Sequence, residues 1–403
     1  MSAAGEFPRL SLAERDRRWA AVRARMRQRE VGCVIVRADS SKWDAGSAEG
    51  RYLTHIGGNG EDGYVVFDLE ADPVFVIWGP DHVANWREIQ DWCPDIRPFR
   101  PSFARTTAGR VRELGRARSR IGLCGRLGSR LWRGEGRWPQ GNHEALRGEL
   151  PEATFVDFDE ELWEEMAVKS AEEIAAIETA MAVTEEAVRV MAEHARPGVR
   201  VREVVGRMLG AMVSAGSDLG IQLLLSAGPR TPRVAARIFP ERTLAAGDVI
   251  INEITGKYVG YHAQMHAPLS VGRPPAPEYR RLFDVALAAL RAGEAILRPG
   301  LDTVELAQAV ARPVSEAGLA ANAMPLFKGM GATIAEMPYS PTGVGLGAGL
   351  PQGTRLQAGM VLLFEPAAYD ERTRTGLHIS EQVVVTRDGY RRLGTLPLEF
   401  RST

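Results

Sequence analysis

Cysteine is scarce in this chain, and neither sign of charge is in excess. Three cysteines stand among 403 residues, all in the first third: Cys33, Cys93 and Cys124. Their odd number and wide spacing fit neither a disulfide framework nor a zinc pattern, so we expect reduced thiols in the cytoplasm. Lysine and arginine total 50 against 51 aspartates and glutamates, for a net charge of -1. This balance argues against nucleic acid or an anionic membrane as a partner bound through bulk electrostatics.

Long hydrophobic runs are missing as well. No apolar run reaches the roughly 18 residues that a membrane span needs. The opening sequence, MSAAGEFPRLSLAERDRRW, turns charged early and lacks the apolar centre of a signal peptide. What is present, 45% hydrophobic and 25% charged residues, is typical of a globular protein. The length of 403 residues predicts two domains.

The first part of the chain alternates helical and strand-like segments. A capping box, S-L-A-E, begins at Ser11 and predicts a helix over residues 11–29. Apolar runs separated by turn residues predict strands, and an amphipathic stretch predicts a further helix. The strands are expected at residues 32–38, 63–69, 72–79 and 120–125, the helix at 107–114, and an exposed loop at 129–143. This alternation predicts an α/β domain over residues 1–164.

The second part opens with another capping box. Ser170 and Glu173 predict a long helix that ends near Pro197. Residues 244–272 alternate apolar residues with turns, which indicates a hairpin of strands. Two helices over 278–297 and 303–316 and a return to strands over 359–386 complete a domain of residues 165–403.

Six segments of the sequence carry a resemblance to a known family. They are RYLTHIGG, KSAEEIAAIETAM, LAAGDVIINEITGKYVGYHAQ, LRPGLDTVEL, LQAGMVLLFEP and HISEQVVVTRDGYRRLG, and they follow one another in the family's order. In these motifs the chain resembles the creatinase/aminopeptidase P/prolidase (peptidase M24) family. The resemblance implies an α/β N-terminal domain, an α+β "pita-bread" C-terminal domain and a homodimer.

The resemblance is weakest at the metal site. Most members hold two divalent metals through two Asp, one His and two Glu, and the metal-bound water attacks the amide. Carried onto this chain, the five positions are Glu253, Gln264, Thr342, Glu365 and Ser380, with Glu381 as a substitute shifted by one residue. An amide and hydroxyls cannot balance the charge of two cations. We therefore expect no metal and no other cofactor.

Creatinase, a member of the family that works without metal, is the nearest precedent. It resembles this chain in keeping a glutamate at the position of Glu365, and it holds a cationic guanidinium substrate with glutamates. His266 stands where creatinase carries a substrate-binding Glu. The proton-transferring histidine of creatinase is not reproduced, because its segment carries Arg237 here. The precedent therefore suggests the chemistry without carrying it over intact.

Four residues are the catalytic candidates. Glu253 and Glu365 are expected in one cleft on neighbouring strands, where two carboxylates repel and one pKa rises unless a cation arrives. That cation could be Arg237, a protonated histidine or a substrate nitrogen. His266 and His378 are the expected proton carriers. For each of the four, a structural role is the competing interpretation.

A second group is expected to contact the substrate. Arg237 could bind a substrate carboxylate with two hydrogen bonds, and a surface role competes with this. Tyr339 could present its phenol to the cleft or pack in a loop. The full set is Arg237, Tyr261, His262, Gln264, Tyr339, Thr342, Ser380 and Glu381.

These residues favour a metal-independent enzyme that acts on a small polar, nitrogen-containing substrate. Hydrolysis of a C–N bond by Glu/His acid–base catalysis is the first hypothesis. A lyase or cyclase of a specialised pathway could use the same pocket. A non-catalytic binding or scaffold protein and a metallopeptidase of the Xaa-Pro type are the remaining alternatives.

Overall fold

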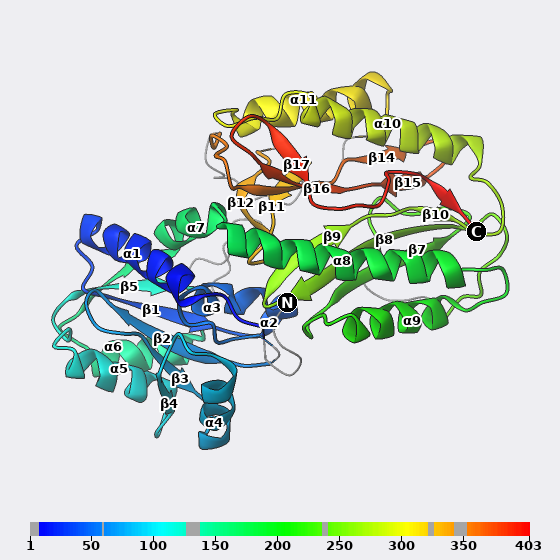
Figure 1. Ribbon diagram of the computed structural model, residues 1–403. Coiled ribbons are helices and arrows are strands. Elements are labelled where there is room, and N and C mark those ends of the chain that lie inside the picture. The colour runs from blue at the N-terminus through cyan, green and yellow to red at the C-terminus, as the bar shows by residue number, and fades with distance from the viewer. Residues whose placement is uncertain (1–7, 59, 126–137, 236–240, 321–325, 342–352) are drawn as a thin grey trace. The chain divides into compact units, whose positions relative to one another are not determined.

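The chain forms two compact units in the computed structural model, residues 1–166 and 167–403 (Figure 1). The structure describes residues 8–58, 60–125, 138–235, 241–320, 326–341 and 353–403. Among these residues, no helix combines the length and the apolar character needed to cross a lipid bilayer. An α/β unit is followed by an α+β unit, as the sequence predicts.

The N-terminal unit is built on one mixed sheet of six strands in the order β4-β3-β2-β1-β5-β6. Its strands are β1 (Cys33–Ala38), β2 (Gly63–Asp68), β3 (Val74–Ile77), β4 (Asp95–Pro98), β5 (Arg120–Cys124) and β6 (Thr154–Asp157). β1 runs antiparallel to β2 and parallel to β5. The helices are α1 (Leu12–Gln28), α2 (Ser41–Asp44), α3 (Ala48–Thr54), α4 (Pro80–Ile89), α5 (Phe103–Glu113), α6 (Gln140–Glu149) and α7 (Asp159–Ala167), with a 3-10 turn at Ala45–Ser47.

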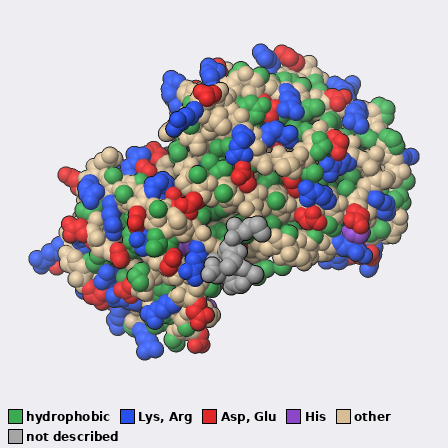
Figure 2. Space-filling view, in the orientation of Figure 1, with side chains coloured by type: hydrophobic (Ala, Val, Ile, Leu, Met, Phe, Trp, Pro, Cys, Tyr) green, Lys and Arg blue, Asp and Glu red, His purple; other side chains and the backbone are tan. Residues whose placement is uncertain are grey.

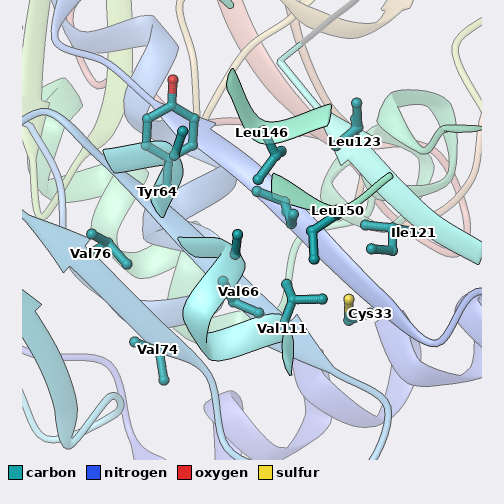
Figure 3. Packing of buried hydrophobic residues seen from close by; sticks show 13 residues of the cluster. Cys33, Tyr64, Val66, Val74, Val76, Val111, Ile121, Leu123, Leu146 and Leu150 are labelled. Carbon is teal, nitrogen blue, oxygen red and sulfur yellow. The ribbon is translucent and has the colours of Figure 1, made fainter. Parts of the chain in front are cut away.

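One hydrophobic core of this unit lies between the sheet and the helices α5 and α6. Val111 of α5 and Leu146 of α6 point toward sheet residues such as Cys33 and Val66, and all are buried (Figure 3). The three cysteines, all within the described residues, are buried and not bridged. Burial raises the pKa of the Cys33 thiol to about 12. Cysteine therefore serves packing in this unit rather than chemistry.

The expected loop over residues 129–143 agrees only in part. Residues 126–137 lie outside the described residues, and helix α6 already begins at Gln140. The helix predicted over 107–114 begins earlier, at Phe103, where Ser102 accepts a hydrogen bond from the Arg105 N–H. The loop was expected because the segment is rich in Arg, Gly and Trp, but its last residues are helical, with Pro139 just before the first residue of α6.

The C-terminal unit contains two five-stranded sheets and a hairpin. The first sheet has the order β18-β10-β8-β7 with β9 paired to β8, and the second has the order β12-β11-β13-β16-β17. The strands of the first sheet are β7 (Gln222–Gly228), β8 (Val249–Tyr258), β9 (Tyr261–Met265), β10 (Leu269–Ser270) and β18 (Arg401–Ser402). Those of the second sheet and the hairpin are β11 (Phe327–Gly329), β12 (Glu336–Tyr339), β13 (Val361–Phe364), β16 (Glu381–Val385), β17 (Tyr390–Arg392), β14 (Ala367–Asp370) and β15 (Thr375–His378).

Two helix pairs flank these strands. The helices are α8 (Ala171–His194), α9 (Val201–Ser214), α10 (Pro277–Glu294) and α11 (Thr303–Glu316). α8 packs on β8 and β9, and α10 packs on β14 and β15 (Figure 1). The predicted capping box of α8 is complete, because Ser170 accepts from the Glu173 N–H and Glu173 accepts from the Ser170 N–H.

Charged side chains of both signs are mixed over the visible surface. Figure 2 shows lysine and arginine interleaved with aspartate and glutamate on each unit. This agrees with the near-zero net charge, and the visible face offers no large field of one sign to attract a polyanion.

Candidate functional site

The β8–β9 hairpin sets the orientation of the first group of site residues. Its turn is Val259–Gly260, with φ of 50° and 78°. Positive φ at both central residues is typical of the tight type I′ turn. Asp218 secures this turn by accepting from the Gly260 N–H at 2.6 Å. The resulting register places Thr255 opposite Gln264.

Alternation along β9 separates the aromatic residue from the polar ones. Tyr261 faces α8, where its hydroxyl lies 2.9 Å from Glu173 Oε1. His262 and Gln264 occupy positions of the opposite orientation along the strand. The Nδ1 atom of His262 lies 3.2 Å from the carbonyl oxygen of Gly331. Tyr261 therefore supports the helix contact, and its hydroxyl is not part of the cluster around Gln264.

Glu253 and Gln264 share a polar network on the first sheet. Gln222 donates to Glu253 at 3.3 Å, and the Gln264 amide donates to Thr255 at 2.9 Å and to Gln222 at 3.4 Å. All four side chains are buried. The Gln264 Oε1 atom has no hydrogen-bond partner within the described part of the chain. The side-chain NH2 of Gln264 thus donates to residues of the sheet, and its Oε1 atom can accept a hydrogen bond from a ligand.

The second sheet contributes a buried ion pair. Lys328 on β11 and Glu365, directly after β13, meet with Nζ 3.0 Å from Oε2. Their side chains are 6% and 1% exposed. β11 and β13 are antiparallel neighbours, so both groups belong to one edge of the site.

The environment of Glu365 raises its pKa to about 7. Burial is the largest cause, the charge of Lys328 opposes it, and the charge of Glu253 adds to it. The charge of Glu253 therefore acts on the carboxyl group of Glu365. They come from two different sheets rather than from neighbouring strands of one sheet, which corrects the expected placement.

Two stacked imidazoles complete the cluster. The rings of His266 and His378 lie 4.5 Å apart with 29° between their planes, and both are buried. The hydroxyl oxygen of Ser380 accepts a hydrogen bond from the backbone N–H of His266 at 2.7 Å. The Asn252 side chain holds the backbone of Ala267 on both sides, at 2.7 and 3.0 Å, which fixes the segment after β9.

Both imidazoles are uncharged at neutral pH. Burial lowers the pKa of His378 to about 4, with a backbone hydrogen bond at Asn252 opposing and Lys328 adding to the shift. Burial, His378 and Lys328 hold the pKa of His266 well below its usual range. Within the described residues, neither ring nitrogen of His266 nor Nε2 of His378 has a hydrogen-bond partner. A ligand that reached the cluster could form hydrogen bonds with these atoms.

The remaining expected residues are spread more widely. Arg237 and Thr342 lie outside the described residues. Tyr339 on β12 is opposite Lys328 in register, and its hydroxyl lies 3.5 Å from the carbonyl oxygen of Ala335. His262 is held by Gly331 rather than by the histidine stack.

Glu381 lies on the other side of β16 from the cluster. Its carboxylate pairs with Arg392 at 2.7 Å. The neighbouring Gln382 side chain instead accepts a hydrogen bond from the backbone N–H of Gln264 at 3.0 Å. Burial is the largest cause that raises the pKa of Glu381 to about 7, with Arg392 opposing and Glu294 adding. A strand directs consecutive side chains to opposite faces, so Glu381 cannot substitute for Ser380 in this register.

Lys328 was missed by the sequence analysis. Its segment, LFKGMG, matches none of the motifs that carry the family resemblance, and one lysine beside glycines is a weak signal. A stronger signal was available, because only four of the 50 basic residues are lysines. Three of those four, Lys169, Lys257 and Lys328, are buried.

The residues at the site do not fit a two-metal centre. Among the described residues, no group of three or more His, Cys, Asp and Glu is placed to hold a metal ion. The undescribed stretches of this unit, 236–240, 321–325 and 342–352, contain none of these residue types in their sequence. Gln264, a neutral amide, stands at one of the expected ligand positions, and the Lys328 ammonium lies against Glu365 at another.

Known proteins resemble both parts of the chain. The model described as "Metallopeptidase family M24" matches residues 175–387, and "Creatinase/Prolidase N-terminal domain" matches 18–166. An Xaa-Pro dipeptidase of Pyrococcus furiosus is 24% identical over 59% of this chain and 66% of its own length. An ectoine hydrolase of Halomonas elongata is 24% identical over 64% and 65%. A prolidase structure from Thermococcus sibiricus matches 98% of this chain and 100% of the prolidase, with a TM-score of 0.80 and 17% identity.

Proposed function

The chain belongs to metallopeptidase family M24, and from that premise we propose that it is a hydrolase that needs no metal ion. It cleaves a C–N bond in a small polar, nitrogen-containing substrate by acid–base catalysis. Glu253, Glu365, His266 and His378 are the catalytic residues of this proposal. The two-domain pita-bread architecture is shared with the family.

A single observation carries the proposal: a buried carboxyl with a pKa near neutrality lies in a cluster of groups that can exchange protons. The pKa of Glu365 is raised to about 7, so the carboxyl can gain or lose a proton at neutral pH. Glu253 adds a second carboxyl group nearby, and the neutral imidazoles of His266 and His378 have ring nitrogens without hydrogen-bond partners among the described residues. Glu365 accepts a proton from the attacking water and returns it to the leaving nitrogen.

The charges favour a substrate with a positive nitrogen. Glu253 and Glu365 carry two negative charges when ionised, Lys328 carries one positive charge, and both histidines are neutral. The sum is one negative charge in a buried site, where an ammonium, amidinium or guanidinium group would be stabilised. The Gln264 Oε1 atom adds an acceptor for an N–H group of that substrate.

A metallopeptidase of the Xaa-Pro type is the second candidate. The names of the relatives favour it over the first, because an Xaa-Pro dipeptidase is among them and the family is named for metallopeptidases. The residues of the site favour the first candidate, because they do not supply the donors of two metals. The ectoine hydrolase carries a name that is not that of a peptidase. The lyase or cyclase alternative gains no support from these names.

Substrate assays with and without a chelator separate the two candidates. We expect chelator-treated protein to release ammonia or an amine from members of a panel of N-acylated, amidino and guanidino amino acids. Glu365→Gln should lower kcat/KM on the best substrate by about 10²-fold or more, which is typical for loss of a general base. Glu186→Gln, an exposed change on α8, is the control. Hydrolysis of Xaa-Pro dipeptides only after addition of Mn²⁺ would replace this proposal with the second candidate.

A further inference from the structure

Lys328 is the one ammonium group placed within this cluster among the described residues. Its Nζ lies 3.0 Å from Glu365, and its charge also lowers the pKa of His266 and of His378. The same field therefore reaches three of the four catalytic candidates. A buried ammonium is costly unless it is paired, so its retention at this place calls for an explanation.

The charge of the site differs from that of a metal-dependent member by a simple count. Two Asp and two Glu bring four negative charges to two divalent metals. Here Gln264 and Ser380 are neutral, so Glu253 and Glu365 bring two negative charges. The Lys328 ammonium reduces these two negative charges to a net of one negative charge. The removal of carboxylates and the presence of Lys328 are thus two parts of one change in charge.

We infer that Lys328 is the resident cation of this site, which takes the place of the metal charge at Glu365 and keeps divalent metals out. The inference rests on the proposed function only in that the site works without metal. The Lys328 ammonium lies 3.0 Å from Glu365 Oε2, so a divalent cation bound at this carboxylate would meet a like charge at short range. Lys328 also holds Glu365 in position, while Gln264 removes the bridging carboxylate.

The choice of lysine supports this role. Arginine supplies 46 of the 50 basic residues, so a lysine is an uncommon choice in this chain. An ammonium is a compact point charge, whereas the planar guanidinium is larger and makes forked hydrogen bonds. At a buried position against one carboxylate oxygen, an ammonium needs less space than a guanidinium.

Manganese binding to a set of variants tests the inference. Gln264→Asp restores a carboxylate at the bridging position, and Lys328→Met removes the ammonium while keeping much of its volume. We expect fewer than about 0.1 Mn²⁺ per chain after equilibrium dialysis for the natural protein and for Gln264→Asp alone. The double variant should bind Mn²⁺ at least about tenfold more tightly than either single variant, because three carboxylates then face no competing cation.

A second buried lysine provides the matched control. Lys169 pairs with Glu336 at 2.6 Å in the same unit, and its side chain is fully buried. Gln264→Asp combined with Lys169→Met should gain no Mn²⁺ binding. If the double variant with Lys328→Met fails to fold alone, added Mn²⁺ should restore folding and raise its Tm.

The possible results separate the inference from the proposed function. Equal Mn²⁺ affinity for Gln264→Asp with and without Lys328 would overturn the role of Lys328 and leave the proposed function standing. Failure of the Lys328→Met double variant to bind Mn²⁺, or to be rescued by it, would do the same. Stoichiometric Mn²⁺ in the natural protein would overturn the proposed function itself.

Discussion

At the scale of single residues, Glu365 binds its proton more tightly in the folded chain than in the unfolded chain. Burial raises its pKa from 4.5 to about 7, with Lys328 opposing and Glu253 adding to the shift. Between these two values the folded form binds more protons, so this group makes the free energy of unfolding fall as pH rises. Its stabilising contribution is complete below about pH 4.5 and is lost as pH approaches about 7.

Glu365→Gln removes this pH dependence while keeping a hydrogen-bonding side chain beside Lys328. The free energy of unfolding of the variant minus that of the natural protein should increase from pH 5 to pH 8, by on the order of 3 kcal/mol. Urea titrations at each pH measure both proteins. The subtraction cancels His378, whose lowered pKa makes stability rise with pH from about 4 to 6.5. A difference that stays constant over this range would contradict the account of Glu365.

Single residues also set the limit of what could be predicted. Glu253, Gln264 and Glu365 could be assigned from motifs, because each stands at a fixed offset in a recognisable segment. For Lys328 the sequence offered only the rarity of lysine, because the contact with Glu365 spans 37 positions of sequence. Whether Glu381 can substitute for Ser380 depends on which face of β16 its side chain occupies, and a shift of one residue reverses that face.

At the scale of elements, the β8–β9 hairpin and helix α8 position the first half of the site. Gly256 on β8 lies against the helix, and a Cβ there would come within 2.6 Å of both the Ala180 carbonyl oxygen and Thr184 Oγ1. The Thr184 hydroxyl bridges the two strands, accepting from the Gly256 N–H at 2.9 Å and lying 3.0 Å from the Ala263 oxygen. Glycine at this position allows the close approach of helix and strand.

Gly256→Ala should therefore separate α8 from β8 and destabilise the unit. We expect a loss of about 2 kcal/mol or more in the free energy of unfolding, measured by urea titration with far-UV circular dichroism. Gly210→Ala in helix α9 is the matched control, because a Cβ there meets nothing within 4 Å. The control should be neutral or stabilised by up to about 1 kcal/mol. Equal effects at the two positions would show that the close packing at Gly256 is unimportant.

Helices and strands with strong local signals were predictable. The capping box at Ser170 and the turn signals around Gly260 identify α8 and the hairpin, because the determining interactions are within a few residues. The pairing of β8 in one sheet and β13 in another was not predictable, since no local signal specifies which strands come together. For this reason the expected neighbouring strands of Glu253 and Glu365 were wrong, although the two side chains do interact.

At the scale of the whole molecule, the fold and the residues of the site suggest different reactions. The family and its fold are those of metallopeptidases. Glu253 and Glu365 carry two negative charges when ionised, and Lys328 offsets one of them, so the proposed site has charge for one monovalent substrate group rather than for two divalent metals. A fold can be retained while its site changes, so the assignment of function rests on the residues of the site.

The most direct test of metal independence is the metal content of the active protein. We predict that elemental analysis after purification without chelator finds fewer than about 0.1 equivalents of Mn, Zn, Fe or Co per chain. Addition of any of these ions should leave both the Tm and the turnover of the best C–N substrate unchanged. One or two equivalents of metal per chain, with activity that is lost on chelation and returns with the metal, would contradict the account and establish a metallohydrolase.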